Sequence, residues 1–319
     1  MSEIEANVFI STKDMTHEQW LASRKAGIGG SDAAAIAGLN KWQSPIGVYY
    51  NKISDGIENE LPSEAAYFGN VLEEIVAEEF SKRTGLKVRK CNSILQHPEY
   101  PWMLANVDRL IVGEELGLEC KTASEYLKKE WEDEEIPASY LIQCQHYMAV
   151  TGYKAWWIAV LIGGNKFTYK KIERDEDIIQ YLIDIEKDFW LNHVEKGIPP
   201  MFDGSEASTS LLKEMYPEPI DNSEIELGNE IELLIEARNQ VDKEIKVLEK
   251  QKTEYENKIK AKLGSNEVGK TEKYTISWKT HTSNRLDNNR LKEERPELYK
   301  RYLKETISRK FTVKQGGNE

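Results

Sequence analysis

The sequence is poor in cysteine, in long apolar runs and in positive charge. Its 319 residues include three cysteines, Cys91, Cys120 and Cys144, with no CxxC pair, which argues against a disulfide framework and falls short of a four-cysteine iron–sulfur site. No run approaches the roughly 20 apolar residues of a membrane span, and the acidic start MSEIEANVF has no apolar signal core. These absences predict a reduced, cytoplasmic protein without a membrane partner.

Positive charge is also scarce, since 43 Lys and Arg oppose 55 Asp and Glu for a net charge of −12. Loose binding of nucleic acid over the whole surface needs broad cationic faces, so this balance argues against it. It does not exclude a nucleic-acid enzyme whose positive charge is confined to a channel and helped by metal ions. The length allows one large domain or two smaller ones.

Up to about residue 220 the chain alternates helical and strand-like patterns. Helices are expected over 16–24, from Ser31 onward, and over 64–85, 139–152 and 175–195. Strands are expected over 87–95, 102–112, 116–123, 154–164 and 166–173, and a loop over 197–208. This order predicts an α/β fold in which a mixed β-sheet is flanked by helices.

From about residue 222 the pattern changes, which predicts one domain over 1–220 and a second over 221–319. Apolar residues at steps of three, four or seven predict a long coiled-coil-like helix over 225–263, followed by a small strand-and-helix extension. The segment GSNEVGKT (264–271) matches the phosphate-loop pattern letter for letter. A helix precedes it and strand residues follow, which inverts the order that a phosphate loop needs, so we expect a helix-to-strand turn.

A glycine-rich stretch, RKAGIGGSDAAAIAGLNKW (24–42), leads into a predicted helix. Its glycines would let the backbone turn sharply and approach a neighbour closely, and Ser31 and Asp32 favour a helix N-cap. The neighbour is either another segment of the chain or a phosphate, because helix N-termini present free N–H groups to anions. The stretch alone leaves both interpretations open.

The segment ANVDRLIVGEELGLECKTAS (105–124) predicts a β-hairpin with charged residues on one face. Strand side chains alternate, so Glu119 and Lys121 point one way and Cys120 points into the opposite layer. The hairpin can bring Asp108 beside them. Two carboxylates and a lysine on a mostly apolar sheet are costly unless they are paired or bound to a metal. The alternative is a cross-strand Lys–Glu pair on half-exposed strands.

Two helices carry further candidates. In the helix expected over 64–85, Gly69 would let the helix approach the sheet closely and deliver Glu73 to the same pocket. Tyr140, Gln143 and Tyr147 have i, i+3, i+7 spacing, which puts them on one helix face. The alternative for these three is a polar stripe in solvent.

Together these pieces resemble the PD-(D/E)xK nuclease superfamily and, more closely, the YqaJ viral recombinase family of phage exonucleases, to which lambda exonuclease is related. The resemblance runs from about Trp20 to Asp203. It rests on WLASRKAGIGGSDAA, FGNVLEE, NVDRLI…LECKTAS and SYLIQCQHYMAVTG in the order that the family has them. Val107 stands where the family usually has proline before the catalytic aspartate. The resemblance implies a restriction-endonuclease-like PD-(D/E)xK core.

The resemblance implies a Mg²⁺-dependent 5′→3′ exodeoxyribonuclease that degrades one strand of linear duplex DNA and leaves 3′ single strands for phage-type recombination by strand annealing. Asp108, Glu119 and the carbonyl oxygen of Cys120 would hold Mg²⁺, for which Mn²⁺ can substitute. A second ion would be shared by Asp108 and helped by Glu73. Lys121 would orient or deprotonate the attacking water and stabilise charge on the phosphate.

The resemblance also implies how DNA is bound. Arg24 and Ser31 match the positions that hold the 5′ phosphate, and Gln143 would position water or phosphate. Trp20 is expected either to stack on a terminal base or to sit in the core, and Tyr140 is expected to contact DNA. The implied partners are double-stranded DNA ends, a RecT-like single-strand annealing protein and further copies of this chain in a ring, expected to be a trimer.

Two rival functions stay open at this point. A structure-specific or restriction-like endonuclease would share the same active-site chemistry. A non-catalytic phage assembly protein would use the long helix for assembly. Such a protein would be expected to have lost Asp108, Glu119 or Lys121, and all three are present.

Overall fold

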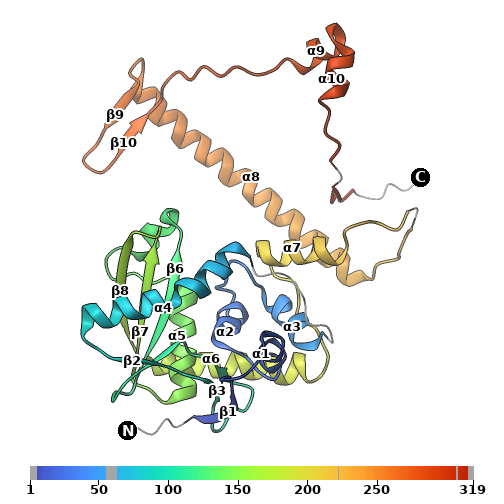
Figure 1. Ribbon diagram of the computed structural model, residues 1–319. Helices are drawn as coiled ribbons and strands as arrows, with labels where there is room; N and C mark the ends of the chain where they lie inside the picture. The colour runs from blue at the N-terminus through green and yellow to red at the C-terminus, as the bar shows by residue number, and fades with distance from the viewer. Residues whose placement is uncertain (1–5, 55–62, 222, 307, 315–319) are drawn as a thin grey trace. The chain divides into compact units, whose positions relative to one another are not determined.

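The computed structural model describes residues 6–54, 63–221, 223–306 and 308–314 (Figure 1). The chain folds as two compact units, Met1–Tyr216 and Pro217–Glu319. The division expected from the sequence lay four residues later, at residue 220.

The first unit is built on a five-stranded mixed sheet with the strand order β2-β5-β6-β7-β8. Its strands are β2 (Val88–Lys90), β5 (Arg109–Ile111), β6 (Leu116–Ala123), β7 (Ala155–Ile162) and β8 (Lys166–Glu173). The pair β6–β7 is parallel and the other three pairs are antiparallel. The chain crosses from β6 to β7 through α5 (Ala138–Thr151). The predicted mixed sheet is therefore confirmed.

Helices cover both faces of this sheet. On one face, α4 (Glu64–Thr84) buries Phe80 against Leu118 and Ala159. On the other, α5 buries residues such as Met148 against Trp156 and its neighbours on β7. Because successive strand residues alternate between the two faces, β7 is apolar on both, as expected of an interior strand in a sheet covered on both faces. The helix α6 (Glu176–Asp188) packs outside α5 and continues as one π-helical segment, η2 (Phe189–Val194).

The N-terminal part packs against α5 and α6. It comprises β1 (Asn7–Ser11), α1 (His17–Arg24), α2 (Gly30–Ile36) and α3 (Pro45–Ile53). The runs expected as single strands over 87–95 and 102–112 each divide in two, because β3 (Ser93–Gln96) and β4 (Leu104–Ala105) join β1 in a separate three-stranded sheet.

Four elements of the first unit were not predicted. They are β1, α3, the 3₁₀ segment η1 (Glu125–Trp131) and α7 (Glu206–Met215). The loop expected over 197–208 ends earlier than predicted, because α7 already begins at Glu206. Ser205 caps this helix by accepting a hydrogen bond from Ser208 N–H. The start of α3 carries recognisable signals, with Ser44 as N-cap and Pro45 in the first turn.

In the second unit, α8 (Asn229–Leu263) is followed by β9 (Val268–Lys270), β10 (Thr275–Ser277), α9 (Asn288–Glu294) and α10 (Pro296–Arg301). The long helix is confirmed, four residues shorter at its start than expected. Gly264 follows α8 with a positive φ of 57°, and β9 then pairs antiparallel with β10. The phosphate-loop look-alike is therefore a helix-to-strand turn.

No helix in the described ranges is apolar over a length that could cross a bilayer.

Candidate active site

The hairpin formed by β5 and β6 brings the predicted acidic residues together. Arg109 lies opposite Leu118 in the antiparallel register, so Asp108 sits beside the middle of β6. Its Oδ2 accepts a hydrogen bond of 2.8 Å from Cys120 N–H. On the α5 side of β6, Lys121 Nζ lies 2.6 Å from Glu119 Oε1. The Cys120 side chain packs on the α4 side, as the alternation of strand side chains predicts.

The electrostatics of this group favour a bound cation. Burial and then the charge of Glu119 hold the pKa of Asp108 well above its usual range. Burial would lower the pKa of Lys121, but the Glu119 and Asp108 carboxylates outweigh it and raise that pKa, so Lys121 is a cation. Glu119 is 2% exposed, and its buried Oε2 has no hydrogen-bond partner among the described residues. A buried carboxylate oxygen left without a donor is a suitable ligand for a hard divalent cation.

Glu73 lies near enough for its charge to help raise the pKa of Asp108, but it is ion-paired with an arginine. Arg109, which the sequence analysis did not single out, donates hydrogen bonds to Glu73 Oε1 and, at 3.1 Å, to Glu74 Oε2. Arg109 is 3% exposed, so it requires such partners. Across the described ranges, no three His, Cys, Asp or Glu side chains are grouped so that they could hold a metal ion. Glu73 is thus held by Arg109 in this structure, and its contribution to a second metal ion stays a prediction.

The expected role of Gly69 is wrong. A Cβ atom placed on Gly69 would lie 3.8 Å from Thr122 Oγ1, an ordinary van der Waals contact. The helix α4 therefore packs on the sheet at a distance that does not require glycine. For Arg109, the available signal was its place in the apolar run VDRLIV. An arginine in such a run needs an acidic partner nearby if it is buried.

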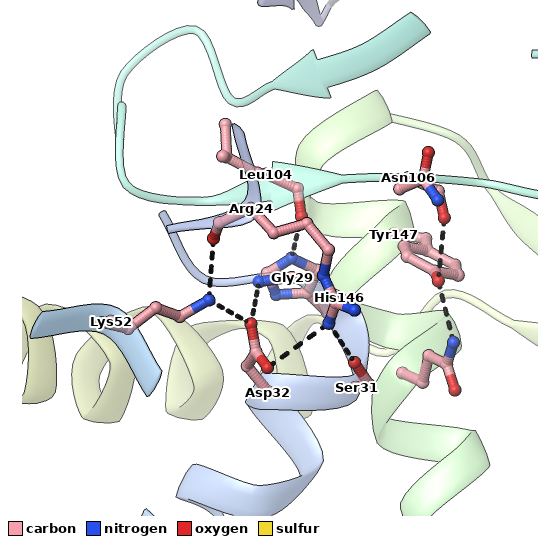
Figure 2. A network of polar contacts seen from close by, with 10 residues as sticks. Arg24, Gly29, Ser31, Asp32, Lys52, Leu104, Asn106, His146 and Tyr147 are labelled. Atoms are coloured by element: carbon pink, nitrogen blue, oxygen red, sulfur yellow. Dashed lines mark hydrogen bonds and ion pairs between the residues drawn. The ribbon is translucent and has the colours of Figure 1, made fainter. Parts of the chain in front are cut away.

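The predicted helix face of α5 points into the site and not into solvent. Gln143 Nε2 donates to Glu119 Oε1 at 2.7 Å and to Tyr147 Oη at 2.8 Å. The Tyr147 hydroxyl in turn donates to the Asn106 carbonyl at 3.2 Å (Figure 2). The Tyr140 ring lies 5.0 Å from Lys121 Nζ, within range of a cation–π contact. These contacts fix Glu119 and Lys121 from the helix side.

The glycine-rich loop is shaped by contacts with the chain itself. A Cβ atom on Gly27 would lie 2.5 Å from the Trp102 carbonyl oxygen, and one on Gly30 would lie 2.7 Å from Tyr147 Cε1. Both positions therefore require glycine for close packing. The predicted cap at Ser31 and Asp32 is wrong: α2 begins at Gly30 with Gly29 as N-cap. The physical reason is that Asp32, in the first turn, reaches back to accept the Gly29 N–H at 3.0 Å.

Arg24 and Ser31 lie together, as expected of two groups that bind one phosphate. Arg24 Nη2 donates to Ser31 Oγ at 3.1 Å (Figure 2). The guanidinium also lies 4.9 Å from the centre of the Trp20 ring, and that ring stacks with His17 at 5.6 Å. Trp20 therefore supports the guanidinium in this structure. Its stacking on a terminal base stays a prediction.

The loop and the hairpin open onto the same hollow. A cavity of about 570 Å³ is lined by Ser31 from α2, by Lys121 from β6 and by Tyr140 and Gln143 from α5. Trp42, which is 89% exposed, lies on its wall. Residues that are widely separated in the sequence thus face one cavity, with Lys121 and Glu130 among the charged residues on its walls.

Two comparisons of the sequence identify its family. The YqaJ-like viral recombinase domain matches residues 19–154. The uncharacterized protein YqaJ of Bacillus subtilis (strain 168) is 45% identical over 317 residues, which is 99% of each chain. The chain therefore belongs to the YqaJ-like viral recombinase family.

Among solved structures, the chain is similar in part to the alkaline exonuclease LHK-Exo from Laribacter hongkongensis. The two share 19% identity with a TM-score of 0.48, over 63% of this chain and 98% of that one. For LHK-Exo in complex with dAMP, the identity is 20% and the TM-score 0.49, over the same shares of the two chains.

Proposed function

We propose that the protein is a metal-dependent exodeoxyribonuclease that degrades one strand of linear duplex DNA from its 5′ end, leaving 3′ single strands for recombination by strand annealing. The observation that carries this proposal is the hairpin group, in which Lys121 is paired with Glu119 beside Asp108 and the buried Glu119 Oε2 has no hydrogen-bond partner among the described residues. Membership in a viral recombinase family supports the recombination role.

The residues present fit a divalent cation. Asp108, Glu119 and the carbonyl oxygen of Cys120 would hold Mg²⁺, with Mn²⁺ able to substitute. A bound ion would supply Lewis acidity and a water of lowered pKa. Glu73 would help to hold a second ion only in exchange for its ion pair with Arg109.

The side chains around this group have separable roles. Lys121 would orient the attacking water and stabilise negative charge on the scissile phosphate. Gln143, fixed by Glu119 and Tyr147, would position water or phosphate. Arg24 and Ser31 would bind the 5′-terminal phosphate, for which a guanidinium offers two parallel donors.

The test is digestion of linear duplex DNA labelled separately at each 5′ and each 3′ end, with and without Mg²⁺. We expect the 5′ label to be released first and the 3′ label to stay on a long single strand. A covalently closed circular duplex should stay intact, and its cleavage would favour a restriction-like endonuclease. Absence of cleavage with either Mg²⁺ or Mn²⁺ would contradict the proposal and favour an assembly protein.

We further propose that the protein acts in the cytoplasm as a homo-oligomeric ring, most simply a trimer, with a RecT-like annealing protein as partner. An acidic exterior around a confined positive channel would be consistent with a ring that receives DNA. Light scattering checks the assembly at micromolar concentration. A monomer that still digests DNA processively would count against the ring.

A further inference from the structure

A buried ion pair lies directly beside Arg24 (Figure 2). Lys52 Nζ is 2.6 Å from Asp32 Oδ2, and the two side chains are 5% and 6% exposed. The Arg24 side chain is 34% exposed and can therefore reach a ligand. Lys52 comes from α3 and lies outside every motif singled out in the sequence.

The pair ties three consecutive parts of the chain together. Lys52 Nζ also donates to the Arg24 carbonyl oxygen at 2.9 Å, at the end of α1. Asp32 Oδ2 accepts the Gly29 N–H in the loop, and Asp32 Oδ1 lies 3.7 Å from Arg24 Nη2. Arg24 is thus held at its backbone by Lys52 and at its guanidinium by Asp32 and Ser31.

Stability alone does not account for this arrangement. Removing two charges from water costs several kcal/mol per ion in a protein interior, so a buried ion pair is weak evidence for stability and apolar residues of similar size often serve as well. A bidentate grip on phosphate, in contrast, requires a guanidinium held in one plane and at one place. The buried pair supplies that constraint.

We propose that Asp32 and Lys52 are positioning residues that hold Arg24 in the orientation needed to bind the 5′-terminal phosphate of DNA. This inference rests on the proposed function. It adds two residues to the phosphate site, neither of which touches the phosphate, and one of them, Lys52, belongs to a helix that the sequence patterns did not reveal.

The test compares the variants Asp32→Asn and Lys52→Met and the double variant with the wild-type full chain. Asparagine can still accept the Gly29 N–H, so the start of α2 is kept while the charge is removed. The probes are two duplexes that differ only in a 5′-phosphate or 5′-hydroxyl end. Binding is measured in EDTA by fluorescence anisotropy, and initial rates are measured with Mg²⁺.

We expect each single variant to lower the preference for the phosphorylated end by about three- to tenfold, as expected for weakening a hydrogen bond to a charged group. The loss should appear in KM for the phosphorylated duplex and leave kcat unchanged. Because the two residues act through one pair, the double variant should lose no more than the more affected single variant.

A matched control is Lys170→Met, which removes another buried lysine. Lys170 on β8 is 8% exposed and donates to the Trp131 carbonyl at 3.0 Å. It has no contact with the Arg24 loop. This variant should lose stability as Lys52→Met does and keep the wild-type preference for 5′-phosphate, which separates positioning from general destabilisation.

Arg24→Ala separates the two ways in which the inference can fail. If Arg24→Ala lowers the preference while folded Asp32→Asn and Lys52→Met keep it, positioning is overturned and the proposed phosphate site stands. If Arg24→Ala also keeps the preference, the phosphate binds elsewhere and both proposals fail on that point. Should Lys52→Met not fold, Asp32→Asn decides alone.

Discussion

The hairpin and the loop, which contribute Lys121 and Ser31 to the lining of one cavity, are opposites in charge. On the hairpin, Lys121 is ion-paired with Glu119, and its positive charge also acts on Asp108. At the loop, Arg24 and the α3 residue Lys52 share one carboxylate, Asp32. The first arrangement has a deficit of positive charge and the second a deficit of negative charge.

The sign of the uncompensated charge determines which ligand each region can bind. A carboxylate pair with one lysine is completed by a cation, and a cation pair with one carboxylate is completed by an anion. A metal ion on the hairpin and a phosphate at the loop would satisfy both at once.

The largest effect is expected on the hairpin. Asp108→Ala, Glu119→Ala and Lys121→Ala should each reduce cleavage by about a thousandfold or more, since each removes charge complementarity at the reacting phosphate. Initial rates on linear duplex measure this, with circular dichroism to confirm folding. Glu115→Ala, on the exposed turn of the same hairpin, is the matched control. Full activity of purified Lys121→Ala would refute the mechanism.

A smaller effect is expected in the loop. Arg24→Ala should reduce the preference for 5′-phosphorylated over 5′-hydroxyl ends by about tenfold, and Ser31→Ala by less, because a charged donor contributes more than a neutral one. The ratio of initial rates on the two substrates measures this. The exposed Lys187 on α6 gives the control Lys187→Ala. An unchanged ratio in both loop variants would leave the loop a purely structural element.

The third prediction concerns stability beneath the loop. His146 and Glu186 are fully buried, 2.8 Å apart, and His146 Nε2 lies 2.9 Å from the Leu104 carbonyl oxygen (Figure 2). Burial would lower the pKa of His146, but Glu186 outweighs it and raises that pKa above 6.5. Burial raises the pKa of Glu186 as well. In both cases the native state holds its proton more tightly than the unfolded chain does.

The stabilisation from His146 is therefore fully present below about pH 6.5 and is lost as the pH rises through its native pKa. We expect the melting temperature to fall with pH above that point. His146→Gln should lower the free energy of unfolding by about 3–5 kcal/mol, because it leaves Glu186 unpaired. It should also make the melting temperature less dependent on pH. Melting curves of both proteins at several pH values check this. If the melting temperature of the variant falls equally steeply with rising pH, groups other than His146 cause the fall.

The smallest effect on cleavage is expected from the second unit. All candidate residues lie between Trp20 and Tyr147, so a chain truncated after Asp221 should still digest linear duplex. The exposed apolar residues of α8, such as Leu234, Val241 and Leu248, would then serve assembly or partner binding. Retained cleavage with lost association with the annealing protein supports this. Loss of folding or of all cleavage would instead show that α8 supports the nuclease unit.

The sequence predicted what depends on nearby residues. Asp108, Glu119 and Lys121 lie within one hairpin, where strand alternation and register are local properties. The same is true of the face formed by Tyr140, Gln143 and Tyr147 on one helix. Strand alternation, a short hairpin connection and helix periodicity predicted these placements, and the burial of Glu119 and Gln143 decided against the solvent-exposed alternatives.

What depends on packing between distant segments was not predicted. Arg109 forms an ion pair with Glu73, which lies on a helix 36 residues earlier in the chain. No sequence periodicity marks such a pair. Lys52 reaches Asp32 only because α3 folds onto α2, and α3 was missed although Ser44 and Pro45 signal its start. The glycines of the loop likewise owe their role to contacts with Trp102 and Tyr147 that lie far along the chain.

The parallel pairing of β6 with β7 has a consequence for synthesis of the protein. Leu116 through Ala123 pair with Ala155 through Ile162, so β6 gains its second neighbour only after α5 and β7 have left the ribosome. Chains emerge from their N-terminus, and Gln143 arrives on the intervening helix. A nascent chain therefore cannot assemble the hairpin group in its final surroundings until about half of the protein has been made. Translation itself therefore delays the assembly of this site.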